Sequence, residues 1–193
     1  MSEVRTKGIY ILGVGAQTAS LIDLVEALNQ PIAGLIHYQE GRTGEFVLGY
    51  PIVGSNDQLF DTENLNGDQF ALSMGDNDIR MSVGDEIRRL GGKIPTFVHP
   101  AAMVSRHAFL EEGVIVQAHS TIGPNATVGR DVNIGYNTVL SHDATVEPGC
   151  LLAANVVVGA YTTLRQRVFV GASSTIVSKR GLTVGKGALI GAG

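Results

Sequence analysis

A histidine followed directly by an aspartate, His142-Asp143, is the pair in this sequence best suited to acid–base chemistry. An imidazole changes its charge near neutral pH, which suits a general base, and an adjacent carboxylate can orient the ring by accepting a hydrogen bond from one nitrogen. A lone exposed His–Asp pair is more often a surface contact without function. Whether the pair is functional therefore depends on the structural elements that position it.

The remaining histidines and the single cysteine do not indicate a metal centre. A three-histidine zinc site needs ligands at suitable spacing, and His99, His107, His119 and His142 are spaced without such a pattern. Cys150 is the only cysteine, which excludes an internal disulfide and a cysteine-rich metal site. We expect no bound metal.

A glycine-rich segment, Gly13-Val14-Gly15-Ala16, lies between an apolar stretch at residues 8–12 and a helical pattern that runs to Leu28. Backbone amides at such a strand-to-helix turn can approach a phosphate closely. As a dinucleotide fingerprint the segment is incomplete, because Thr18 stands at the third glycine and His37 replaces the expected acid. The pattern favours a nucleotide-diphosphate contact over an NAD site, and a merely tight turn is the alternative.

The segment around this turn alternates strand and helix patterns. Strands are expected at residues 8–12, 31–36 and 68–74, and helices from the glycine turn to 28 and at 76–90. Ser55 is a candidate N-cap for a short helix ending at Phe60. Residues 1–97 are therefore predicted to form an α/β domain with a small Rossmann-like parallel sheet.

From Val98 onward the sequence is periodic. Val, Ile or Leu falls at every sixth position through Ile176, which makes 14 consecutive positions, and a small residue or valine follows four places later except at Arg180. After a slip of two residues, the pattern resumes at Val184 and Ile190. Both kinds of residue point inward when side chains alternate along a strand, so three six-residue rungs make one triangular coil. Residues 98–193 are predicted to form a parallel β-helix of hexapeptide repeats, placing His142 and Asp143 at a coil corner.

Composition and charge narrow the functional class. The net charge is −4, yet residues 151–193 carry five basic residues and no acid, whereas residues 1–150 carry 9 basic and 18 acidic residues, 9 − 18 = −9. The basic end could face an anionic ligand or could simply be solvated. No apolar run is long enough to span a membrane and no signal core is present, so we expect a cytoplasmic protein with no membrane or nucleic-acid partner.

Several motifs together resemble the sialic-acid O-acetyltransferase-like family, which includes N-acetyltransferases of nucleotide-linked amino sugars. The likeness covers nearly the whole chain, and His142-Asp143 and Gly13-Val14-Gly15-Ala16 are part of it. Its further marks are Gly49-Tyr50-Pro51-Ile52-Val53-Gly54, Met74-Gly75-Asp76-Asn77-Asp78-Ile79-Arg80, His99-Pro100-Ala101-Ala102 and Leu189-Ile190-Gly191-Ala192-Gly193.

The resemblance implies a left-handed β-helix, a homotrimer, and an acetyl-CoA-dependent enzyme that acts on an amine, or less readily a hydroxyl, of a nucleotide sugar for surface polysaccharide or glycan precursors. It implies that His142 is the base in a direct transfer, Asp143 orients it, and the backbone amide of Ala160 binds the oxyanion. The substrate would meet Gly13, Gly15, Ala16, Gln17, His37 and Asn77. Coenzyme A would meet Ala160, Arg165, Gly171, Lys179, Arg180 and Lys186.

The sequence also departs from the family pattern. Gln17 replaces a histidine, His37 an aspartate, Leu151 a second histidine and Ala160 a glycine, and the usual tail with a Gly-x-Pro-Ala-Lys element is not present. These departures leave open two alternatives, a non-catalytic binding or assembly homologue and an acyltransferase for another small acceptor.

Overall fold

The computed structural model describes residues 7–177 and 179–193, which form two compact units. The first comprises residues up to Gly75 together with Ser82–Pro95, and the second comprises Asp76–Met81 together with Thr96–Gly193. One helix, α3 (Asn77–Arg89), therefore contributes its first residues to the second unit and its later residues to the first.

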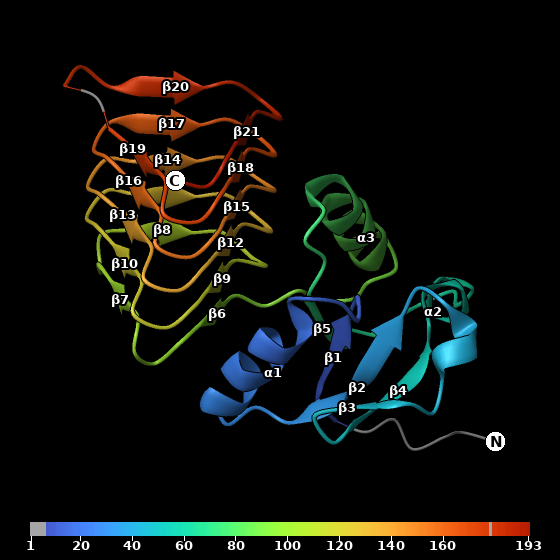
Figure 1. Ribbon diagram of the computed structural model, residues 1–193. Coiled ribbons are helices and arrows are strands. Elements are labelled where there is room, and N and C mark those ends of the chain that lie inside the picture. The colour runs from blue at the N-terminus through green and yellow to red at the C-terminus, as the bar shows by residue number, and fades with distance from the viewer. Residues whose placement is uncertain (1–6, 178) are drawn as a thin grey trace. The chain divides into compact units, whose positions relative to one another are not determined.

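The first unit is built on a five-stranded sheet in the order β3-β4-β2-β1-β5 (Figure 1). Strands β1 (Ile9–Leu12), β2 (Ile32–His37), β4 (Tyr50–Ser55) and β5 (Gln69–Leu72) are parallel, as the alternation of strand and helix predicts. The short strand β3 (Phe46–Val47) is antiparallel to β4. Neither β3 nor β4 was expected from the sequence, so the sheet is larger than predicted and mixed at one edge.

The helices of the first unit pack on the sheet. Helix α1 (Thr18–Ala27) packs on β1 and β2, and the later part of α3 joins a core with Leu12, Phe70 and Leu72. Helix α2 (Asn56–Phe60) starts with the predicted Ser55 cap, which forms a capping box with Gln58. A 3₁₀ turn, η1 (Glu40–Arg42), follows β2.

The second unit is a triangular parallel β-helix whose strands stack into three sheets (Figure 1). Every strand contains one of the aliphatic residues of the six-residue period, and these side chains form a single buried column. The first sheet stacks β7 (Met103–Val104), β10 (Thr121–Ile122), β13 (Val139–Leu140), β16 (Val157–Val158) and β19 (Thr175–Ile176). The second stacks β8 (Phe109–Leu110), β11 (Thr127–Val128), β14 (Thr145–Val146), β17 (Thr162–Leu164) and β20 (Leu182–Val184). The third stacks β6 (Phe97–Val98), β9 (Ile115–Val116), β12 (Asn133–Ile134), β15 (Leu151–Leu152), β18 (Phe169–Val170) and β21 (Leu189–Ile190).

The corners of the coils repeat one backbone conformation. A residue with positive φ occurs every six positions, and asparagine and aspartate, which tolerate this region best among side-chain-bearing residues, occupy nearly half of these corners. The series is Gly113, His119, Asn125, Asp131, Asn137, Asp143, Gly149, Asn155, Tyr161, Arg167 and Ser173.

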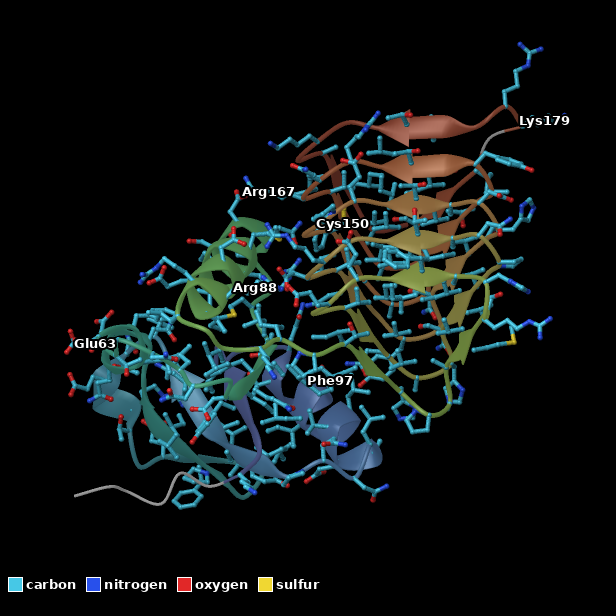
Figure 2. The ribbon with its side chains drawn as sticks, turned by 180° about the vertical axis from the view of Figure 1, so that it is seen from behind. Glu63, Arg88, Phe97, Cys150, Arg167 and Lys179 are labelled. Atoms are coloured by element: carbon cyan, nitrogen blue, oxygen red, sulfur yellow. The ribbon has the colours of Figure 1, made fainter. Side chains whose placement is uncertain are left out.

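Inward-pointing polar side chains connect successive coils. The hydroxyl of Ser120 donates to the carbonyl of Gly135, that of Thr138 donates to Ala153, and the Cys150 thiol donates to Arg165. Cys150, with its yellow sulfur, lies inside the stack (Figure 2), and burial raises the pKa of its thiol to about 11. The hydroxyl of Thr162 is buried without a partner in the described part of the chain.

The predicted slip in the repeat lies in the turn between β19 and β20. Val146 pairs with Leu164, which follows it by one regular coil of three rungs. Leu164 in turn pairs with Val184, which lies beyond that regular spacing by the length of the slip. The chain is therefore longer between β19 and β20 than between the corresponding strands of the coils below.

The first turn of α3 seals one corner of the β-helix. Arg80 is 1% exposed and donates to the carbonyls of Asp131, Gly149 and Cys150 at 3.1, 2.9 and 3.2 Å. Burial lowers the pKa of its guanidinium to about 10, and the nearby Asp131 carboxylate opposes that shift. Asp78 pairs with Arg167 at 3.1 Å on the same side. We name the corners at residues 111–114, 129–132, 147–150, 165–168 and 185–188 the Arg80 corner.

The helices of the described residues are short, and none has the length and apolar character needed to cross a bilayer.

Candidate active site

His142 and Asp143 occupy the corner between β13 and β14, as predicted. We name this edge of the stack, at residues 105–108, 123–126, 141–144, 159–161 and 177–181, the His142 corner. A Cβ atom on Gly123, one coil below, would lie 2.7 Å from the backbone nitrogen of His142. Glycine at that position is what lets the chain pass close beneath the histidine.

The two side chains form a hydrogen-bonded dyad at the surface. Nδ1 of His142 lies 2.7 Å from Oδ2 of Asp143, and the side chains are 51% and 34% exposed. The imidazole's hydrogen bond, and secondarily that of Asn125, lowers the pKa of the Asp143 carboxyl below its usual value. The Nε2 atom of His142 makes no hydrogen bond to any described residue, so one nitrogen of this half-exposed ring can accept a proton from an incoming group.

Asn125 stands directly below Asp143, because the strands that precede them, β10 and β13, pair as neighbours one coil apart. Its Nδ2 donates to the other carboxylate oxygen, Oδ1 of Asp143, at 3.2 Å. The carboxylate is thus fixed from two sides. Sequence reasoning did not single out Asn125, although counting back one full coil from Asp143 would have found it.

Above the dyad lies Tyr161, with its ring centroid 5.4 Å from that of His142 and an interplanar angle of 86°. This edge-to-face arrangement is a favourable one for two aromatic rings. The side chain is 63% exposed, and its backbone φ is +59°. Tyr161 was also not among the predicted site residues.

The backbone amide of Ala160 is placed one coil above His142, about 4.8 Å away by the usual strand spacing. Its N–H has no hydrogen-bond acceptor among the described residues. Equivalent amides at the Arg80 corner do have acceptors, because those of Arg130 and Gln166 donate to the carboxylates of Glu111 and Glu147 at 2.7 and 3.1 Å. This corner position therefore offers an N–H that binds an anionic oxygen, and none of the described residues occupies that place at Ala160.

The residues predicted for coenzyme A are distributed over the corners. Lys179 and Arg180 lie with Ala160 at the His142 corner, in the longer turn before β20, and both are exposed. Arg165 lies at the Arg80 corner and pairs with Glu147 at 2.6 Å, and Lys186 lies at that corner too. Gly171 lies at the third corner, which we define as residues 99–102, 117–120, 135–138, 153–156 and 171–174. A Cβ atom on Gly171 would lie 2.5 Å from the backbone nitrogen of Ala192. Of these predicted residues, Ala160, Lys179 and Arg180 share one corner of the stack.

The glycine turn of the first unit has one structural and one unconstrained glycine. Gly13 has a φ of +87°, and a Cβ there would meet Met74, so the fold itself requires this glycine. Gly15 and Ala16 are exposed, and a Cβ on Gly15 would meet nothing within 4 Å. Glycine at 15 is therefore not explained by packing within the chain, which suits the close approach of a ligand.

Thr18 explains why the dinucleotide pattern is broken. Its hydroxyl accepts from the Gly15 amide at 2.7 Å and donates to the Gly13 carbonyl at 3.0 Å, and Ser73 donates to the same carbonyl. A threonine thus closes the turn by hydrogen bonds. Gln17 lies at the N-cap of α1 without capping it through its side chain.

The other two predicted substrate residues lie in structured surroundings. His37 is 2% exposed at the end of β2, where its Nδ1 accepts from the Gln39 amide at 2.9 Å and its Nε2 lies 3.4 Å from Arg42 Nη1. Asn77 belongs to the second unit, donates to the Arg167 carbonyl at 3.0 Å and accepts from Arg80 at 2.8 Å. Both side chains already hold the fold together.

Three or more His, Cys, Asp or Glu side chains suitably grouped to hold a metal ion do not occur within residues 7–177 and 179–193.

With this geometry established, known proteins can be compared. The family model described as "Hexapeptide repeat of succinyl-transferase" matches residues 125–160 and 166–193. The acetyltransferase domain of PglB from Neisseria gonorrhoeae, solved with acetyl coenzyme A, superposes with a TM-score of 0.86 over 97% of this chain and 89% of that one at 21% identity. WeeI from Acinetobacter baumannii gives 0.86 over 97% and 90% at 15% identity. These two matches confirm the predicted fold, including the left-handed β-helix.

A third structure is closer in sequence. A variant of perosamine N-acetyltransferase from Caulobacter crescentus, with one histidine replaced by asparagine and with CoA and GDP-perosamine bound, is 28% identical over 95% of this chain and 88% of that one, with a TM-score of 0.69. This match, together with the repeat model, supports the family expected from the motifs. The chain carries a hexapeptide repeat of the acyltransferase type. A search of curated proteins finds no match.

The six-residue rungs of the sequence placed His142 and Asp143 at a coil corner, and the structure has them there. The supporting residues, Asn125 and Tyr161, belong to the same column of stacked corners as Asp143. Their stacking with Asp143 follows from the spacing of one full coil of three rungs. The six-residue period, which predicts the fold, does not by itself indicate which corners stack on one another.

Proposed function

We propose that the protein transfers an acetyl group from acetyl-CoA to the amine of a nucleotide-linked amino sugar. The observation that carries this proposal is the His142 corner, where Nδ1 of His142 is held by Asp143 at 2.7 Å while Nε2 is open. The amide of Ala160, which has no acceptor within residues 7–177 and 179–193, lies one coil above. A base and an oxyanion donor are the two groups that acyl transfer to an amine requires.

The reaction follows from these positions. The amine nitrogen attacks the thioester carbonyl carbon as Nε2 of His142 takes a proton from that nitrogen, and the Ala160 N–H stabilises the negative oxygen. The carbon–sulfur bond then breaks, the proton passes from the imidazolium to the departing sulfur, and CoA and the amide are released. Asp143 stabilises the transient imidazolium and keeps Nδ1 as the protonated nitrogen. No covalent acyl-enzyme is needed.

The proposal for the two substrates rests on similarity and on charge. The PglB domain was solved with acetyl coenzyme A and the Caulobacter enzyme with CoA and GDP-perosamine. The basic residues 151–193, with Lys179 and Arg180 at the His142 corner, suit the phosphates of CoA. The exposed Gly15 and Ala16 suit the diphosphate of a nucleotide sugar.

The setting of the reaction is proposed in the same way. We place it in a cytoplasmic homotrimer that supplies acetylated sugars for surface polysaccharide or glycan precursors, with N-acetylation favoured over O-acetylation. The amine is favoured because, once unprotonated, it is a stronger nucleophile than a sugar hydroxyl and needs less assistance from an exposed base.

The test is turnover of acetyl-CoA with UDP-, GDP- and dTDP-linked amino sugars, followed by release of the free CoA thiol. Replacing His142 by glutamine should lower kcat by about 10²-fold or more. His119→Asn is the matched control, since His119 is an exposed corner histidine at the third corner with a φ of +61°. Near-normal turnover by the His142 variant would overturn the assignment of the base. Binding of CoA and sugar nucleotide with no thiol release would instead favour a non-catalytic homologue.

A further inference from the structure

Tyr161 is an unusual residue for the place it occupies. Corner positions with positive φ are filled elsewhere in the stack by Asn, Asp, Gly or His, apart from Arg167 and Ser173. Bulky side chains are rare in this region because Cβ crowds the backbone, so a tyrosine here costs stability that an asparagine would not. A residue kept in an unfavourable conformation beside a base points to a functional demand.

Packing within the fold does not account for the tyrosine. Its side chain is 63% exposed, so it adds little to the buried column. Directly above it lies Gly181, where a Cβ would come within 2.9 Å of the Tyr161 carbonyl oxygen. The coil above thus passes over the tyrosine backbone with a glycine.

The ring meets the imidazole of His142 edge to face, at 5.4 Å and 86°. Asp143 fixes the imidazole through Nδ1, but a single hydrogen bond leaves the ring free to rock about it. A second contact, from the coil above, limits that rotation and keeps Nε2 directed toward the same point.

The exposed part of the tyrosine has two features that suit a sugar acceptor. Its ring offers an apolar surface, which matches the C–H face of a pyranose, and its phenol hydroxyl has no hydrogen-bond partner among the described residues. Both lie beside the base that takes the proton from the acceptor amine.

We propose that Tyr161 is a positioning residue for His142 and a contact residue for the ring of the acceptor sugar. This inference rests on the proposed acetyl transfer to a sugar amine. In this proposal, the ring of Tyr161 bounds the acceptor site on the side of the coil above His142. Such a ring favours a cyclic sugar over an amine on a flexible chain.

Two variants separate the two roles. Tyr161→Asn installs a residue that suits positive φ and removes the ring, so we expect an unchanged or higher melting temperature together with a drop of about 10-fold or more in kcat/KM for the sugar. Tyr161→Phe keeps the ring and removes the hydroxyl, so kcat should stay within about twofold while the sugar KM rises about threefold or more.

The matched control is Ser173→Asn, at another exposed corner with a φ of +63°. It should stabilise the fold in the same way and leave kcat/KM unchanged. If Tyr161→Asn keeps kcat/KM within about twofold of the wild type, the proposal is overturned. An unchanged sugar KM in the phenylalanine variant would remove the hydroxyl contact.

A spectroscopic measurement makes the outcome independent of turnover. The Cε1–H resonance of His142 can be assigned by its loss in His142→Gln. Because the imidazole lies against the ring of Tyr161, this resonance should shift in Tyr161→Asn but not in Ser173→Asn. An unmoved resonance would overturn the positioning role even in an active enzyme. Absence of thiol release by the wild type with every sugar would contradict the proposed function, while the resonance still decides whether Tyr161 holds the imidazole.

Discussion

Two corners of the same β-helix share one backbone plan and serve opposite purposes. At the Arg80 corner, the first turn of α3 inserts a buried guanidinium, and glutamates fill the outward amides of Arg130 and Gln166. At the His142 corner, no described residue accepts from the amide of Ala160, and the dyad is half exposed. The same backbone position is therefore filled by the chain's own side chains at the Arg80 corner and is left without a described partner at the proposed site.

Two aspartates express this contrast most directly. Asp131 and Asp143 have the same corner conformation, with φ of 57° and 56°. Asp131 is fully buried near Arg80, whereas Asp143 is 34% exposed and bonds His142. Substitution of Asp131 should therefore lower the stability of the fold, whereas substitution of Asp143 should lower activity.

The largest effect is expected at the sealed corner. Arg80→Ala removes the donor to three backbone carbonyls and opens a cavity, so it should lower the free energy of unfolding by about 3–5 kcal/mol. Urea denaturation of the whole chain measures it. The exposed Arg106→Ala should change that free energy by less than about 0.5 kcal/mol, and equal losses in both variants would contradict the structural role of Arg80.

The exchange of the two aspartates should give opposite results. Asp143→Asn should lower kcat by about 10- to 100-fold, since a neutral amide stabilises the imidazolium poorly, while leaving the melting temperature nearly unchanged. Asp131→Asn should lower the melting temperature by several degrees, because it leaves the buried Arg80 charge less compensated, with kcat of the folded enzyme retained. Thiol-release kinetics and thermal denaturation on both variants check this. If both variants lose mainly activity or mainly stability, the contrast between the corners is wrong.

A smaller effect is expected from the asparagine below the dyad. Asn125→Gly preserves the positive φ but removes the donor to Asp143, so kcat should fall about threefold to 10-fold. Asn155→Gly is its counterpart at the third corner, with the same φ of 60° and no side-chain hydrogen bond among the described residues. Activity of the Asn155 variant should equal that of the wild type, and a similar loss in both would show that the effect is one of backbone flexibility.

The smallest effect concerns acid stability. Because the hydrogen bonds from His142 and Asn125 lower the pKa of Asp143 in the folded state, the ionised carboxylate stabilises the fold above its unfolded pKa. That contribution is lost as the pH falls below about 4 and passes through the lowered value. Thermal denaturation between pH 5 and pH 2 should show a slightly flatter acid limb for Asp143→Asn than for the wild type. Superimposable limbs would indicate that the dyad contributes nothing to stability.

The sequence predicted the strands of the β-helix closely because burial there follows a strict period. Val98, Val104 and the later aliphatic residues lie in strands as expected, and the slip after Ile176 falls in the turn between β19 and β20. The position of His142 and Asp143 at a corner followed from the same counting. In the first unit, the Ser55 cap, the strands β1, β2 and β5 and the helices were predicted from the local pattern, whereas β4, which ends at Ser55, was not.

What escaped prediction depends on contacts between distant segments. Arg80 belongs to an amphipathic helix, where arginine is ordinarily solvated, and only its fold partners near Gly149 and Cys150 make it buried. The strand β3 is very short and pairs with β4, so its sequence contains no periodic pattern that would predict it. The resemblance assigns Arg165 to coenzyme A, whereas its ion pair with Glu147, one coil earlier at the Arg80 corner, was not predicted from the sequence.

The slip in the repeat after Ile176 has a consequence for how such a scaffold can diversify. Each coil contacts only the coils above and below it, so the extra residues are absorbed in one turn and the strands on either side regain their pairing at once. The number of residues in a corner turn can thus change without any change to the repeat on either side of it. Grafting longer or shorter turns between β19 and β20, one coil above Ala160 and Tyr161, offers a way to change which molecules reach His142 while the coil that carries it keeps its sequence.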